Sequence, residues 1–273
     1  VSRSSQSFQN DNIDLWFHIK SDVKENCGCI LDFIKEKLGD KVGEPTSQDA
    51  SSKSTSSDGK GGKVLGSRFS ENLNNPTDPL TVSKHCLVGA EDMEHFGASY
   101  VLAQRFKINW DQVHSMSEDQ IEDIIGRKTD DTIIPDRDTR THIKSARRQD
   151  KHGNTTPLLR LGLPFGESAH TACPYLAVHG SNIADEAGIY FAGYTKSLSV
   201  LETIMDHQIG NMPDFMNDRL FNNVKSDFGG FFYIPSIKDL NLDTGEYLES
   251  QWKGKTGLES FPWNRLDKIR SSF

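Results

Sequence analysis

Short stretches in which hydrophobic and polar residues alternate recur along the chain, and each of them predicts a strand. In residues 100–108 the apolar side chains share one face: Tyr100, Leu102, Phe106 and Ile108. The same alternation predicts strands at residues 12–20, 157–163, 188–194 and 229–234. Residues 12–20 read as a half-buried strand whose apolar face carries Ile13, Leu15, Phe17 and Ile19.

Segments with helical spacing separate these strands. Helices are predicted at residues 23–38, 117–126, 199–208 and 213–224. The helix at 117–126 has the clearest boundaries, because Ser117 and Gln120 form a capping box and Gly126 ends it. The helix at 213–224 would begin with a proline at its first position.

The order of these elements predicts the fold class. Short helices between antiparallel strands are typical of α+β folds, and the order fits two related halves. Residues 45–62 are almost entirely small, polar or charged and cannot supply a core, so they predict a mobile loop or insertion. Residues 127–157 form a long basic segment, and such loops in compact domains are more often functional than idle.

Composition narrows the function classes. Of the 273 residues, 35% are hydrophobic and 26% charged, which is typical of a soluble globular protein. A net charge of −8 argues against nucleic acid or an anionic membrane as the main partner. No apolar run approaches the ~18 residues that a membrane span needs. The four cysteines need not pair in a chain of this length, and we expect thiols at Cys27, Cys29, Cys86 and Cys173.

The first residues carry neither a starting methionine nor a signal-like apolar stretch. The chain therefore reads as processed or incompletely sequenced at its start, so that any targeting information is lost. A cytoplasmic location is slightly favoured.

Three segments in a fixed order carry residues that suit one kind of site. Residues 69–76 contain Glu71, residues 141–143 contain His142, and residues 159–166 contain Arg160. An acid, a histidine and an arginine set apart in this way can build a haem pocket. The histidine would bind iron from one side, and the acid and the arginine would act on peroxide from the other.

Arg160 is the strongest of the three on physical grounds. The leucines at 159, 161 and 163 share one face of the predicted strand, which leaves Arg160 on the other face with Gly162. A guanidinium in the middle of an apolar strand must meet water, a carboxylate or a polar cavity. A salt bridge or an edge-strand arginine remains the alternative.

His142 and Glu71 are weaker signals taken singly. A lone histidine in a basic loop is usually solvated, and an acid in a turn-rich stretch is usually at the surface. An iron-binding histidine needs a carboxylate or carbonyl at its second nitrogen. Glu202 is the favoured carboxylate, although with Ser199 it also fits a capping box. Two other acids are possible partners of His142, namely Asp218 and Asp227.

These segments resemble the dye-decolorising peroxidase family, haem proteins built from two ferredoxin-like halves. The resemblance rests on Phe69 and Asn75-Pro76 around the acid, on the Thr-His-Ile segment at 141–143, and on the arginine followed by Pro164-Phe165-Gly166. Further similar stretches lie at residues 99–106, 124–127, 188–194 and 229–236. The likeness covers roughly residues 12–40 and 64–240.

The resemblance implies a haem peroxidase that reduces hydrogen peroxide and oxidises an organic electron donor, with haem b as the iron cofactor. It implies His142 as the iron ligand and Glu71 and Arg160 as the catalytic pair. Pocket-wall and haem-binding candidates are Phe165, Met205, Phe231, Phe232 and Glu202. Aromatic residues that can relay electrons are Tyr190, Tyr194, Tyr233, Trp110 and Trp252, although aromatic residues on strands more often belong to the core.

The resemblance also predicts a division of the chain. Residues 1–78 would form an N-terminal ferredoxin-like half, residues 79–245 the haem-binding half, and residues 246–273 a tail. The family would open with a further strand, helix and strand before Asn12. We therefore expect either a homo-oligomer or a partner segment that completes the N-terminal half.

The departures from the family keep other functions open. The acid is Glu71 rather than aspartate, and Arg68 and Asn72 stand where the family has glycine. A haem-binding protein with little peroxidase turnover, or a structural or assembly subunit without haem, are the alternatives. The dipeptide Cys173-Pro174 resembles short haem-contact motifs, but such dipeptides are common and a thiolate ligand is disfavoured.

Overall fold

The computed structural model describes chiefly the central part of the chain. The described residues are 11, 13–21, 23–41, 43, 63–64, 69–70, 75–76, 78–128, 132–135, 138, 140–146, 158–165, 188–211 and 217–240. The predicted insertion at 45–62 and the predicted tail at 246–273 lie outside them.

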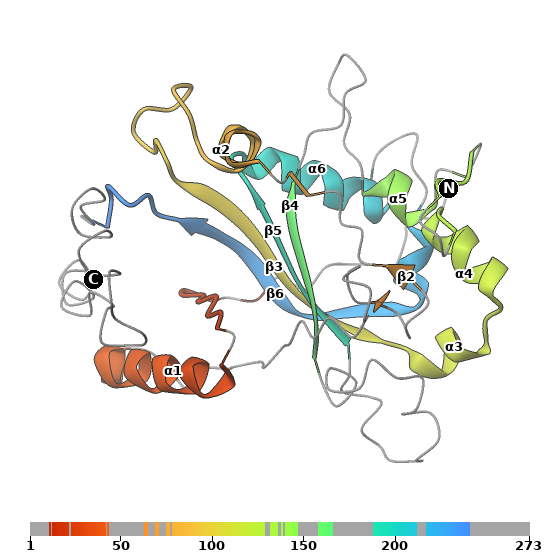
Figure 1. Cartoon of the computed structure of the whole chain (residues 1–273), viewed down its shortest axis with the longest axis horizontal. Helices are drawn as coiled ribbons and strands as arrows, with labels where there is room; N and C mark the ends of the chain where they lie inside the picture. Colours follow the sequence, from red (N-terminus) through yellow and green to blue (C-terminus); the bar gives the residue numbers. More distant parts are fainter. Residues whose placement is uncertain are drawn as a thin grey trace.

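A four-stranded sheet forms the centre of the molecule (Figure 1). Its strands are β3 (Ser99–Ile108), β4 (Leu159–Phe165), β5 (Gly188–Thr195) and β6 (Val224–Ile234). They are ordered β4-β5-β3-β6, and every neighbouring pair is antiparallel. Helices lie between β3 and β4 and between β5 and β6, which is the β-α-β-β-α-β order of a ferredoxin-like unit. The prediction of an α+β fold with antiparallel strands is confirmed.

Six α-helices are described. They are α1 (Lys24–Leu38), α2 (Pro79–Cys86), α3 (Trp110–Ser115), α4 (Glu118–Ile125), α5 (His142–Ser145) and α6 (Leu198–Gln208). Two 3-10 helices accompany them, η1 (Gly39–Lys41) and η5 (Arg219–Asn222). A separate antiparallel pair of two-residue strands consists of β1 (Lys63–Val64) and β2 (Phe69–Ser70).

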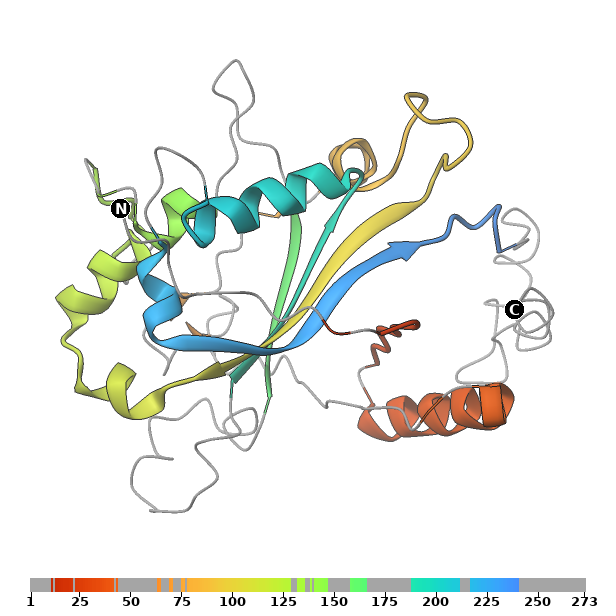
Figure 2. The ribbon, with the colours of Figure 1, turned by 180° about the vertical axis from the view of Figure 1, so that it is seen from behind.

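Different helices lie on the two sides of the sheet. On one face, called the front face, α6 runs across the strands with α2 and α5 near its ends (Figure 1). The buried core between the front face and α6 consists of Leu102, Leu158, Val200, Leu201 and Ile204. Burying one aliphatic side chain of this size contributes about 1.5–3 kcal/mol. On the other side, called the back face, α1 lies apart from the sheet (Figure 2).

The strand register assigns each side chain to one of these faces, because directly opposed residues of antiparallel strands share a face. One row across the sheet belongs to the front face: Arg160, Gly193, Leu102 and Phe231. The next row belongs to the back face: Leu159, Tyr194, Val101 and Phe232.

Each edge strand of the sheet is contacted by an asparagine or aspartate from another segment. At β4, the side-chain amide of Asn75 donates to the carbonyl of Arg160 at 2.7 Å, and its oxygen accepts from the Arg160 N–H at 2.8 Å. At β6, the N–H of Asp11 donates to the carbonyl of Gly229, and the Asp11 carboxylate accepts from the Gly229 N–H. Both contacts occupy backbone groups that an edge strand otherwise leaves open for another chain.

Most predicted elements occur near their predicted bounds. Ser117 and Gln120 form the capping box at α4, and Gly126 follows it with φ of 86°. The helix predicted at 199–208 exists as α6, but its N-cap is Ser197 and the capping pair of Ser199 with Glu202 is wrong.

Two predicted elements do not form as expected. Residues 13–20 are part of no strand in the described sheet. In the described part of the helix predicted at 213–224, η5 replaces an α-helix and β6 begins at Val224.

The described cysteines are free thiols, and they are Cys27, Cys29 and Cys86, whereas Cys173 lies outside the described residues. In the described part of the chain, no helix has the length and apolar character required to cross a bilayer.

Candidate active site

His142 is the first residue of α5, a single helical turn that lies beside the end of α6. Its Nδ1 lies 2.7 Å from a carboxylate oxygen of Asp218, 76 residues later in the chain. The His142 side chain is 34% exposed, whereas Asp218 is completely buried. The imidazole is therefore held from inside the protein and keeps one side open.

Asp218 makes several contacts besides His142. One carboxylate oxygen also accepts from the Ser145 hydroxyl at 2.6 Å, and the other accepts from the N–H of Leu220 at 2.9 Å. A buried carboxylate needs such donors, because burying it without them costs far more than the contacts return. Asp218 thus ties α5 to the start of η5.

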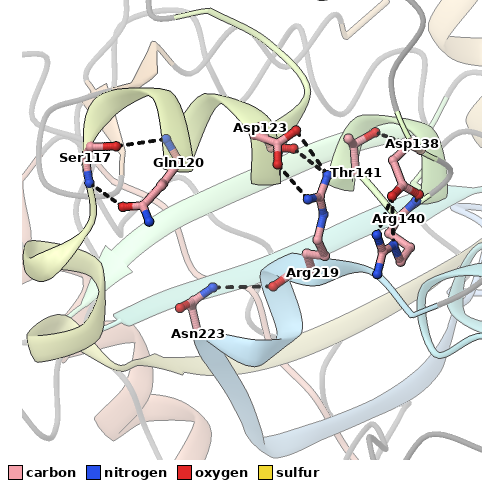
Figure 3. Close-up of polar contacts among 8 residues, drawn as sticks. All are labelled: Ser117, Gln120, Asp123, Asp138, Arg140, Thr141, Arg219 and Asn223. Carbon is pink, nitrogen blue, oxygen red and sulfur yellow. Dashed lines mark hydrogen bonds and ion pairs between the residues drawn. The ribbon is translucent and has the colours of Figure 1, made fainter.

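The segments that carry His142 and Asp218 are also joined through their neighbours (Figure 3). The N–H of Arg219 donates to the carbonyl of Arg140 at 2.9 Å. The Arg219 guanidinium reaches Asp123 at the end of α4, with a shortest contact of 2.6 Å. Arg140 folds back onto Asp138, at 2.6 and 2.9 Å, and lowers the pKa of that carboxyl to about 2. Exposed pairs of this kind contribute little stability, but together they fix the approach to α5.

Arg160 lies on β4 and projects from the front face, on the side of α6. Its neighbour on β5 is Gly193, where an added Cβ would lie only 3.1 Å from the ring of Phe191 and 3.2 Å from Leu158. Asn75 holds the Arg160 backbone through both its N–H and its carbonyl. One guanidinium nitrogen also donates to the carbonyl of Leu158 at 3.3 Å.

The structure separates the pocket-wall candidates. Met205 packs against the front-face core, on the side of Arg160. Phe165 and Phe232 project from the back face, opposite to Arg160, and their part in a pocket wall stays a prediction. The ring of Phe165 lies under the guanidinium of Arg105, and Phe232 stacks on Trp16. Of the two neighbouring phenylalanines on β6, Phe231 is the one on the front face.

The carboxylate beside His142 is Asp218, not Glu202. Glu202 lies on the exposed side of α6. The contact with His142 that we expected from Glu202 is made by Asp218, one of the two alternative acids. Glu71 and Arg68 lie outside the described residues.

Sequence reasoning missed Asn75 as a partner of Arg160 and gave Asp218 no priority. The available signal for Asp218 was its position before a short turn, where an aspartate often accepts from backbone N–H groups. The predicted helix at 213–224 hid this signal, because it placed Asp218 in the helix interior.

Comparison with known proteins identifies the family. A family model described as "Dyp-type peroxidase, C-terminal" matches residues 67–239, well over half of the chain. The chain belongs to the Dyp-type peroxidase family. The recognition made from the three motifs is thereby confirmed.

Two curated members of the Dyp-type family illustrate the degree of similarity. A dye-decolorizing peroxidase of Mycobacterium tuberculosis is 27% identical over 240 residues, which cover 84% of this chain and 62% of that protein. One of Mycolicibacterium paratuberculosis is 26% identical over 231 residues, covering 84% of this chain and 59% of that protein. The chain thus spans about three fifths of the length of these relatives.

Solved Dyp-type structures share the fold. A variant of Rhodococcus jostii RHA1 DypB in complex with heme gives a TM-score of 0.73 at 24% identity, covering 90% of this chain and 73% of that chain. The encapsulated DyP-type peroxidase of Mycobacterium smegmatis gives 0.73 at 22% identity, covering 89% and 72%. At this identity the likeness establishes the fold, and the chemistry of this chain depends on its own residues.

Proposed function

We propose that this chain carries the haem-binding site of a peroxidase that reduces hydrogen peroxide and oxidises organic donors in one-electron steps. The observation that carries the proposal is the pair of His142 and Asp218. A buried carboxylate that engages one imidazole nitrogen orients the ring and raises its basicity as a ligand. The same arrangement is the usual second contact of a histidine that binds a metal.

The residues present fit haem. Nδ1 of His142 is engaged by Asp218, and among the described residues Nε2 has no hydrogen-bond partner. The exposed third of the side chain leaves room for Nε2 to bind iron. When bound, haem would supply a centre of iron and porphyrin that together can take up two oxidising equivalents from peroxide and pass them on singly. Haem b is the form that we propose, since a histidine ligand suits it.

Arg160 is proposed to stabilise charge at the peroxide. Its guanidinium remains protonated and projects from the front face, the side on which α5 and α6 lie. It would bind the peroxide oxygen that becomes negative as the O–O bond breaks. Asn75 would keep the guanidinium in place by holding the backbone from which it extends.

Glu71 is proposed as the acid that moves a proton from the inner to the outer oxygen of peroxide, which then leaves as water. Glu71 precedes Asn75 by four residues, a length of chain that spans at most about 14 Å. The contact of Asn75 with Arg160 therefore supports a common site for the acid and the arginine. Met205 is proposed as a pocket wall on the same face.

Absorption spectroscopy tests this proposal. The purified protein is loaded with haem and its spectrum recorded before and after one equivalent of hydrogen peroxide. We expect a strong Soret band that changes promptly with peroxide. A Soret band that peroxide leaves unchanged would indicate that the protein binds haem but is not a peroxidase. The absence of a Soret band after haem addition would indicate a protein that shares the fold without binding haem.

Two substitutions assign the residues. His142→Ala should abolish haem retention, because it removes the ligand. His95→Ala is the matched control, since His95 also contacts a carboxylate, Asp92 at 2.9 Å, but lies in the loop between α2 and β3. Arg160→Ala should retain haem and slow the reaction with peroxide by about a hundredfold. Equal haem content in His142→Ala and in the unmodified protein would contradict the assignment of the ligand.

A further inference from the structure

The two carboxylate oxygens of Asp218 have different contacts. One oxygen accepts from the N–H of Leu220 at 2.9 Å. The other lies 2.7 Å from Nδ1 of His142 and also accepts from the hydroxyl of Ser145 at 2.6 Å. His142 and Ser145 therefore share a single oxygen, and the backbone contact on the first oxygen holds the carboxylate in that orientation.

Ser145 reaches this oxygen because it follows His142 by three residues on α5. Side chains at this spacing lie on the same side of a helix, so both of them face Asp218. Ser145 and Asp218 are completely buried, which keeps water away from their contact. The Ser145 hydroxyl also lies 3.0 Å from the carbonyl of His142, but a carboxylate oxygen at 2.6 Å is the stronger acceptor.

We propose that Ser145 is a positioning residue that raises the reduction potential of haem bound at His142, acting through Asp218. The inference rests on the proposed haem site. A carboxylate that accepts from an imidazole N–H makes the ring a more electron-rich ligand. A second hydrogen bond to the same oxygen stabilises part of the negative charge there. Ser145 thus weakens the effect of Asp218 on His142.

The sign of the effect follows from the charge of the iron. An electron-rich histidine stabilises ferric iron more than ferrous iron, because the ferric ion carries one more positive charge. Hydrogen bonds to the axial ligand are therefore one of the ways in which a protein sets the potential of haem. Loss of the Ser145 hydroxyl should leave more charge for His142 and lower the potential. If Ser145 only oriented the carboxylate, its loss would weaken the contact with His142 and raise the potential.

Spectroelectrochemical titration of the haem-loaded full chain tests the proposal. In Ser145→Ala the ratio of ferric to ferrous haem at a fixed potential should rise about tenfold, which for one electron is a fall of about 59 mV. Resonance Raman spectra of the ferrous protein give a second readout. The stretching frequency between iron and histidine should increase in Ser145→Ala, since a more electron-rich ring binds iron more strongly.

Thr141→Val is the matched control. Thr141 directly precedes α5 and is also completely buried, but its hydroxyl donates to the carbonyl of Asp138 at 3.1 Å (Figure 3). This substitution removes a buried hydroxyl beside the same helix without changing the donors on Asp218, so the potential should stay unchanged. Asp218→Asn removes the negative charge and should raise the potential, opposite to Ser145→Ala.

An unchanged or raised potential in Ser145→Ala, with haem retained and an unchanged circular dichroism spectrum, would overturn the proposal. So would an equal fall in Thr141→Val, because loss of any buried hydroxyl near α5 would then suffice. Either result leaves His142 as the haem ligand, since the compared proteins all hold haem. Absence of a Soret band in the unmodified protein would instead overturn the haem site and the role of Ser145 together.

Discussion

At the scale of single residues, burial distinguishes the carboxylate that contacts His142 from the other acids. Asp218 is completely buried and satisfies His142, Ser145 and the N–H of Leu220 at once. Glu202 stands exposed on α6, where water screens any charge that it carries. A buried carboxylate with its donors in place orients an imidazole far better than a solvated one does.

We therefore expect Asp218→Ala to lower the free energy of unfolding by about 3 kcal/mol, because it leaves buried donors without an acceptor. Glu202→Gln should change it by no more than about 0.5 kcal/mol. Urea unfolding followed by circular dichroism measures both. The assignment of Asp218 fails if the two variants unfold at the same urea concentration.

Tyr194 predicts a pH dependence of stability. Burial raises the pKa of Tyr194 to about 12 in the folded protein, whereas this pKa is near the ordinary value of 10.0 when unfolded. A group whose pKa is raised by folding contributes stability below the unfolded pKa, and this contribution is lost as pH rises. The free energy of unfolding should thus fall as pH rises from 10 toward 12.

Tyr194→Phe provides the comparison for this alkaline loss, because it keeps the ring and removes the ionisable hydroxyl. Urea unfolding across this pH range should show a shallower fall in the variant. An identical fall in both proteins would assign the alkaline loss to other groups.

At the scale of elements, glycines decide how closely the strands and their side chains approach. A Cβ added at Gly188, the first residue of β5, would lie 1.9 Å from the backbone carbonyl oxygen of Phe106. A Cβ added at Gly162 on β4 would meet only Ile189, at the ordinary contact distance of 3.7 Å. Two glycines in neighbouring strands therefore have very different tolerance for a side chain.

Gly188→Ala should lower the free energy of unfolding by about 3 kcal/mol, since the backbone of β3 would have to move. Gly162→Ala is its matched control and should remain within about 1 kcal/mol, because the added methyl finds space. Thermal unfolding compares the two variants. Equal losses would mean that the close approach of β5 to β3 is relaxed in solution.

At the scale of the whole molecule, the two faces of the sheet carry different sets of polar residues. The front face carries Arg160 and supports α6, beside which His142 lies, whereas the back face carries the pair of Tyr194 and His18. The Asx contacts at β4 and β6 occupy backbone groups at both edges. The predicted homo-oligomer, or a segment that completes the N-terminal half, remains a prediction.

If haem binds the folded protein and not the unfolded chain, it must stabilise the fold by mass action. Free haem at a hundred times its dissociation constant should add about 2.7 kcal/mol to the free energy of unfolding. His142→Ala should show no such gain, whereas His95→Ala should show it in full. Urea unfolding with and without haem measures the difference, and an equal gain in both variants would place haem away from His142.

Local patterns predicted the local elements well. Alternation located the strands of the ferredoxin-like unit, and the Ser117–Gln120 pair with Gly126 located α4. These signals succeed because the period of a strand and the cap of a helix depend on residues close together in the chain. Alternation also predicts that Phe165 and Arg160 lie on opposite faces of the sheet. They are five positions apart on β4, and residues at odd spacing on a strand point to opposite faces.

Other predictions needed contacts between distant segments. Residues 13–20 alternate like a strand but pair with none in the described sheet, and Trp16 and His18 contact the back face instead. The end of the helix predicted at 213–224 became a 3-10 turn followed by β6, where Asp218 accepts from the backbone. In both segments, packing against the sheet outweighed the local preference.

The sequence by itself determined the strand and helix periods, the α+β class and the family, because these depend on patterns and motifs of neighbouring residues. It also marked His142 and Arg160 through their chemistry. Only the tertiary structure decided that Asp218 rather than Glu202 holds His142, that Asn75 holds Arg160, and that His18 meets Tyr194. The residues of these pairs lie between 76 and 176 positions apart, and no local preference ranks one distant partner above another.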